Sequence, residues 1–162
     1  MAKALLAVCL LPSALFLSSC GPKVDLKQAL RLTDLSTGWF DAGIVDGKNK
    51  LVPSVTFRLE KTTTASLTPL SLNVAFKRLN GQQEEEQDEI FLQKVEFANG
   101  ARTAPLTIRG EHGYTGDPPQ SRADMLRNSQ FLDYRAVIFA KYGSGQWVQM
   151  AKVDIQRQLL VK

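Results

Sequence analysis

Apolar residues recur at every second position through much of this chain, and that spacing limits the folds that the chain can adopt. Val55, Phe57 and Leu59 alternate with polar neighbours, and residues 70–76 repeat the pattern. A period of two places one set of side chains on one face of an extended strand, so it is typical of half-buried β-strands. Residues 24–32 carry the same spacing, with one break at Gln28. We therefore expect a body made of strands.

Turn-forming residues separate these expected strands. Residues 61–66 are polar and suit a hairpin or a crossover between sheets, and Gly143-Ser144-Gly145 indicates a hairpin. Asn80-Gly81 and Asn99-Gly100 indicate two further turns. The less regular apolar runs, also expected as strands, are 90–97, 106–108, 134–142 and 146–160, the last with Trp147, Ala151, Val153 and Ile155 on one face. Only residues 121–129 have helical spacing.

About seven short strands joined by polar turns predict an all-β fold, an antiparallel two-sheet sandwich with one short helical turn. The alternation in residues 55–59 and 69–76 resembles that of the small immunoglobulin-like domains of bacterial envelope lipoproteins. The cysteine pair and tryptophan spacing of antibody domains are absent. Side chains expected to point inward are Phe57, Leu59, Leu72, Val74 and Phe76, and those expected to point outward are Arg58, Asn73 and Lys77.

The N-terminal residues have the three zones of a secretory signal. Lys3 supplies a basic start, the stretch 4–17 is apolar except for Pro12 and Ser13, and Ser18-Ser19 are small. A transmembrane helix needs roughly 20 apolar residues, so the run is too short for an anchor.

With a cysteine directly after the small residues, Leu17-Ser18-Ser19-Cys20 resembles the lipobox of bacterial lipoproteins. The resemblance implies a diacylglyceryl group on the Cys20 thiol, cleavage before Cys20 and a membrane anchor. The alternative is an ordinary secretory signal in which the cysteine is incidental. In the Gram-negative lipoproteins an aspartate after the cysteine favours the inner membrane, so Gly21 favours the periplasmic side of the outer membrane.

Three segments follow from this interpretation: a signal peptide at 1–19, the lipidated N-terminus with the first strand at 20–33, and the rest of one sandwich at 34–162. Cys9 leaves with the signal and Cys20 carries lipid, so the mature domain has no thiol for a disulfide or a metal site. Its stability has to come from the apolar core.

Charge and residue content argue against several classes of function. The formal net charge is +4, or +3 once Lys3 is removed with the signal, and the basic residues form no cluster of the kind that binds nucleic acid. His112 is the only histidine, and no Gly-x-Ser-x-Gly motif occurs. We expect no metal, no cofactor and no catalysis.

Neighbouring carboxylates in the acidic run 84–89 would splay apart and rarely converge on one site. The run is therefore predicted to be a solvated turn. Residues 46–50 are likewise predicted to form a turn rather than a calcium loop. The alternative function is a carboxylate-dependent envelope hydrolase acting on glycan or peptide, which two converging acidic side chains would favour.

Two connections are candidate binding sites. Residues 110–122 carry His112 and Tyr114 and are stiffened by Pro118-Pro119. Residues 36–41 carry Trp39 and Phe40, which would form a contact patch if exposed; burial at the end of the sandwich is the favoured alternative. The sequence thus predicts a lipid-anchored envelope protein that binds or scaffolds, with the membrane and an envelope protein or glycan as partners.

Overall fold

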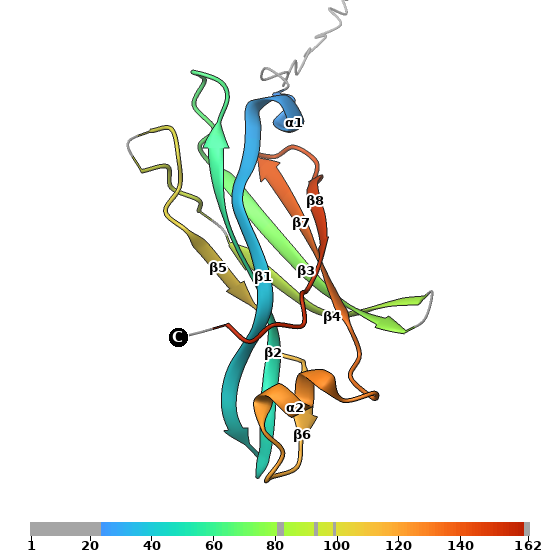
Figure 1. Cartoon of the computed structure of the whole chain (residues 1–162). Helices are drawn as coiled ribbons and strands as arrows, with labels where there is room; N and C mark the ends of the chain where they lie inside the picture. The colour runs from blue at the N-terminus through green and yellow to red at the C-terminus, as the bar shows by residue number, and fades with distance from the viewer. Residues whose placement is uncertain (1–23, 81–82, 93, 99, 161–162) are drawn as a thin grey trace, which may run out of the picture.

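The computed structural model describes residues 24–80, 83–92, 94–98 and 100–160. Two antiparallel sheets form a sandwich, which confirms the predicted fold class (Figure 1). The first sheet contains β1 (Leu30–Val45), β2 (Lys48–Lys61), β5 (Leu106–Arg109) and β6 (Tyr114–Gly116). The second contains β4 (Gln83–Leu92), β3 (Leu70–Asn80), β7 (Tyr134–Tyr142) and β8 (Val148–Asp154). The predicted signal and Cys20 lie outside the described residues, as do Gly81 and Asn99 of the predicted turns.

The strand order follows the immunoglobulin-like pattern. In the first sheet the order is β1-β2-β5, and in the second it is β4-β3-β7-β8. These positions correspond to strands A, B and E on one side and C′, C, F and G on the other. The polar segment after β2 is the crossover between sheets, and Gly143-Ser144-Gly145 lies in the hairpin between β7 and β8.

The period of two correctly predicts the core of β2 and β3. The five side chains expected to point inward are fully buried: Phe57, Leu59, Leu72, Val74 and Phe76. Arg58 and Lys77 are only partly exposed, and Asn73 is 7% exposed although it lies on the outer face of β3. Asn73 therefore points outward as predicted, but it is buried there, because Phe91 of β4 and Phe139 of β7 flank it across the strands.

The first strand differs from the prediction at both ends. Residues 26–29 form α1 (Leu26–Ala29), a helical turn whose N-cap Asp25 accepts a hydrogen bond from the Lys27 amide at 3.0 Å. The described residues therefore form two short helices, α1 and the predicted one, α2 (Arg122–Arg127). β1 then runs past residue 33 to Val45, so the segment 36–41 is strand and not an irregular connection.

A β-bulge in β1 explains why the simple alternation misplaced this segment. Thr33 pairs with Arg58 and Ser36 with Thr56, so β1 carries one extra residue, and Asp34 adopts a φ of 53°. One inserted residue inverts which side chains face the core. Leu30 before the bulge and Trp39 after it are consequently both buried.

The acidic run is also strand, in contrast to the predicted turn. Residues 84–89 belong to β4, which ends at Leu92 instead of continuing to residue 97. β8 contains another bulge, since Ile138 pairs with Ala151 and Phe139 with Gln149. Trp147 therefore lies on the outer face, opposite the side predicted for it, whereas Ile155 is buried as expected.

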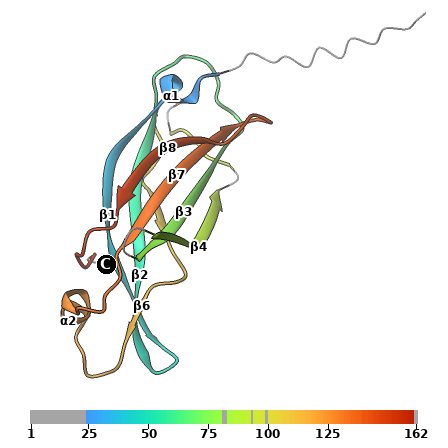
Figure 2. The same cartoon turned by 90° about the vertical axis from the view of Figure 1, so that its right-hand side faces the viewer.

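The sandwich has two distinct ends, which both views show (Figures 1 and 2). We call them the α1 end, with α1 and residues 62–69, and the α2 end, with α2, β6 and the β1–β2 hairpin. After β8 the C-terminal segment crosses to the first sheet and lies along β1. There the Trp39 amide donates to the Gln158 carbonyl at 2.8 Å, and the Leu160 amide donates to the Trp39 carbonyl at 2.9 Å.

Candidate functional site

The predicted loop 110–122 contains the short strand β6 and leads into α2. β5 and β6 both pair with β2, so they form one strand interrupted by residues 110–113. The Gly110 amide donates to the Pro53 carbonyl at 2.9 Å. At Gly113 a Cβ atom would lie 2.0 Å from the Leu51 carbonyl oxygen, so this close approach requires glycine. Residues 110–113 thus bulge out of the strand and lie against β2.

Asp88 of β4 holds this bulge in place. Its Oδ2 accepts hydrogen bonds from the amides of Glu111 at 2.9 Å and His112 at 3.0 Å. Its Oδ1 lies 2.6 Å from His112 Nδ1. The Asp88 side chain is only 5% exposed, whereas that of His112 is 65% exposed. A buried carboxylate needs such partners, so Asp88 links the second sheet to the bulge of the first.

This Asp88–His112 contact was not predicted from the sequence. The two residues are 24 positions apart, and Asp88 belongs to the run that was expected to be solvated. A β-bulge precedes it, because Phe76 pairs with Asp88 but Lys77 with Glu86. The alternation of the run therefore changes at this point, and no local pattern marks Asp88 as the inward-pointing carboxylate.

The aromatic candidates lie mostly in the core. Trp39 is 0% exposed and makes edge contacts with Phe131 at 4.6 Å and Tyr134 at 5.4 Å between ring centroids. Tyr114 packs on Phe131 at 4.8 Å and is partly buried. Phe40 lies beneath the guanidinium of Arg109, 3.5 Å from the ring centroid. The burial alternative therefore describes Trp39, and a Trp39–Phe40 contact patch does not form.

The outer face of the second sheet carries exposed aromatic residues that sequence reasoning placed elsewhere. Phe91 is 50% exposed and Trp147 is 37% exposed, with 6.0 Å between their ring centroids. The Lys141 ammonium lies 4.8 Å from the Trp147 ring centroid. Beneath this pair Asn73 donates to Glu89 at 3.1 Å, while its Oδ1 is buried with no hydrogen-bond partner. We call Phe91, Trp147, Phe139 and Lys141 the aromatic face.

Acidic side chains that lie near one another on this sheet share cations. Glu84 contacts Arg135 at 2.6 Å and Lys152 at 2.8 Å, and Asp154 contacts the same arginine. The hydrogen bonds from Lys152 and Arg135 lower the pKa of Glu84, and the bond from Arg135 lowers the pKa of Asp154. Both carboxylates are therefore stabilised as anions, whereas a glycosidase acid needs a raised pKa.

No family model matches this chain, and no curated protein matches it either. Among the described residues no three His, Cys, Asp or Glu side chains are grouped closely enough to hold a metal ion. Across those same residues, no helix combines the length and the apolar character that crossing a bilayer requires.

Proposed function

We propose that this protein is a lipid-anchored protein of the bacterial envelope that acts by binding or scaffolding. The observation that carries the binding function is the aromatic face, where Phe91 and Trp147 stand side by side on the outer surface of the sheet. Exposed aromatic rings are costly to leave in water and dominate the energy of many interfaces. The two rings project from a hydrogen-bonded antiparallel sheet, whose backbone is already paired before a partner binds.

The proposed location rests on the N-terminal residues. Leu17-Ser18-Ser19-Cys20 supplies the lipidation site, and Gly21 in place of aspartate favours the periplasmic side of an outer membrane. Stable anchoring takes more than one acyl chain, which a diacylglyceryl group provides. The anchor would keep the aromatic face near envelope proteins and glycans, the two partner classes that this surface suits.

The envelope hydrolase has less support from the side-chain geometry. Glu84 and Asp154 approach one another, but Arg135 contacts both. The oxygens of Asp88 are occupied by the bulge and by His112. Neither arrangement leaves one protonated and one free carboxylate facing a substrate, which acid–base cleavage of a glycosidic bond requires.

The test compares partner capture by the wild-type acylated protein and by the Phe91→Ala/Trp147→Ala variant. Envelope proteins are captured after cross-linking in cells, and binding of cell-wall glycan is measured on the same preparations. Leu35→Ala serves as the control, because Leu35 is 42% exposed on the first sheet. We expect the double variant to lose a specific partner that wild type and control retain. Equal capture by all three would overturn the assignment to the aromatic face.

A further inference from the structure

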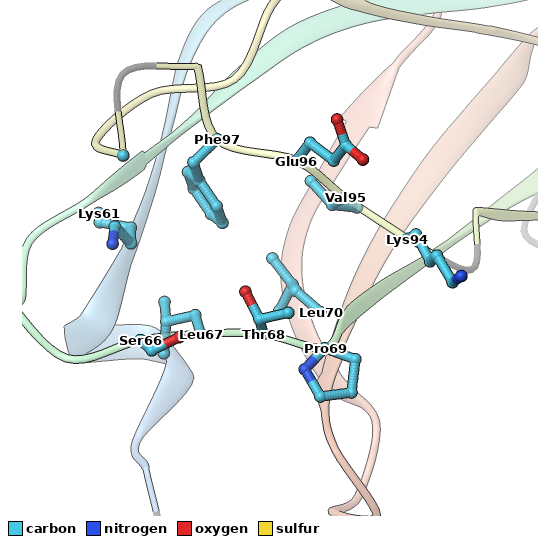
Figure 3. Close-up of a pocket in the computed structure, with 11 residues that line it drawn as sticks. Lys61, Ser66, Leu67, Thr68, Pro69, Leu70, Lys94, Val95, Glu96 and Phe97 are labelled. Carbon is cyan, nitrogen blue, oxygen red and sulfur yellow. The ribbon is translucent and has the colours of Figure 1, made fainter.

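A cavity of about 570 Å³ opens at the α1 end of the sandwich. Its walls are residues 66–70, which lead into β3, and residues 94–97, which follow β4 (Figure 3). The Val95 amide donates to the Leu70 carbonyl at 3.0 Å and joins the two walls. The volume is in the range of sites that hold small molecules.

The lining of the cavity is apolar in the middle and basic at the edges. Figure 3 shows Val95 and Phe97 pointing toward Leu67 and Leu70 on the opposite wall, whereas the carboxylate of Glu96 points away. Lys61 and Lys94 stand at opposite sides of the cavity. The Lys61 ammonium lies 5.5 Å from the centre of the Phe97 ring. Within the described part of the chain, neither lysine forms an ion pair with a carboxylate.

The proposed lipid anchor lies only a few residues before the start of the domain. Four residue steps separate Cys20 from Val24, a reach of at most about 14 Å. α1 follows directly, and the Thr62 amide donates to the Ala29 carbonyl at 3.0 Å. The segment that carries Lys61 to Leu70 is therefore tied to the point where the anchored chain enters the domain. A lipid on Cys20 would hold this end at the membrane surface.

From the lining and the short tether, we propose that the cavity binds an anionic phospholipid of the membrane that holds the anchor. Lys61 and Lys94 both attract the headgroup phosphate, and the upper part of an acyl chain lies along Leu67, Val95 and Phe97. Basic residues near an anionic membrane surface are attracted to it, and aromatic rings suit the interface between headgroups and acyl chains. This inference rests on the proposed lipid anchor. It orients the domain with the α2 end away from the bilayer.

The experiment uses the lipid-modified protein in vesicles of phosphatidylethanolamine with and without phosphatidylglycerol. Hydrogen exchange reports protection of residues 66–70 and 94–97, and native mass spectrometry of the protein released from the vesicles identifies any retained lipid. We expect protection and a retained phosphatidylglycerol only in the anionic vesicles. Equal protection of these residues in both kinds of vesicle, or retention of a fatty acid in place of phosphatidylglycerol, would overturn the proposal. So would protection in detergent without added phospholipid, because the acyl chains on Cys20 would then account for it.

Two matched variants locate the effect. Lys61→Gln/Lys94→Gln removes the two charges at the cavity, and Lys48→Gln/Arg127→Gln removes two charges at the α2 end. The first should weaken retention of phosphatidylglycerol about 30-fold, from the usual contribution of a basic residue at an anionic surface, and the second should leave it unchanged. Equal loss in both would overturn the site. The mass of the N-terminal peptide that contains Cys20 is measured separately. This distinguishes a protein without the anchor from an anchored protein whose cavity binds no lipid.

Discussion

Phe76 and Phe91 lie on opposite faces of the second sheet, so replacing each by alanine should change the stability by very different amounts. Phe76 is 0% exposed in the core, and Phe91 is 50% exposed on the aromatic face. We expect Phe76→Ala to lower the free energy of unfolding by roughly 3–5 kcal/mol because it leaves a cavity. Phe91→Ala should cost about 1 kcal/mol, the size of a surface ring contact. Urea denaturation of both variants tests this, and equal losses would contradict the assigned faces.

A second prediction at the residue scale concerns Gly113. A Cβ atom there would lie 2.0 Å from the Leu51 carbonyl oxygen, a backbone atom that cannot move aside cheaply. Gly113→Ala should therefore separate β6 from β2 and increase hydrogen exchange at Tyr114 and Gly116. Thr115→Ala is the control, because Thr115 is exposed in the same strand. Unchanged exchange in the Gly113 variant would show that the bulge lies farther from β2.

At the scale of elements, Asp88 joins β4 to the bulge between β5 and β6. Asp88→Ala removes the acceptor for the amides of Glu111 and His112, and a hydrogen bond to a charged group contributes about 1.5–3 kcal/mol. We expect a loss of that size in urea denaturation, with faster exchange of the two amides. Glu111→Ala keeps both amides paired with Asp88 and should be nearly neutral. If the two variants lose the same stability, Asp88 does not hold the bulge.

Glu84, Asp154, Arg135 and Lys152 form a group of ion pairs on the second sheet, which we call the charged ladder. This ladder predicts a pH dependence of stability. The folded-state pKa values of Glu84 and Asp154 lie below their ordinary values of 4.5 and 3.8, chiefly because of hydrogen bonds from Lys152 and Arg135. A lowered folded pKa adds stability above the ordinary value, and this stability is lost as the pH falls through the folded pKa.

The variant Glu84→Gln/Asp154→Asn should therefore be less stable at neutral pH and lose less stability on acidification. Urea denaturation between neutral pH and about pH 3 measures this difference. Glu111→Gln/Asp117→Asn makes the same change of charge outside the ladder and should retain the wild-type acid sensitivity. A wild-type profile in the ladder variant would contradict the role of these two carboxylates.

At the scale of the whole molecule, the proposed anchor determines where the domain is found. Cys20→Ser removes the only thiol of the mature chain that could carry lipid, so we expect an unprocessed or soluble product. Membrane fractionation and the mass of the N-terminal peptide measure the outcome. An unmodified Cys20 in the mature wild-type protein would contradict the lipoprotein interpretation, while leaving the sandwich and its aromatic face as described.

The candidate site was predictable only in part. The loop containing His112 was identified from its glycines and prolines, because turn chemistry is local. Its partner Asp88 was not, since the contact joins strands from different sheets and depends on a bulge in β4. The aromatic face was missed for a similar reason: the bulge in β8 reverses the side on which Trp147 lies.

The sequence alone determined the all-β fold class and the buried side of β2 and β3, because an unbroken period of two assigns each side chain of those two strands to a face. The tertiary structure decided the faces of β1, β4 and β8, where bulges interrupt that period. A bulge depends on which residues pair across strands, and such pairing is not encoded by spacing within one strand. For the same reason, only the folded sandwich placed Lys61 and Lys94 around one cavity beside α1.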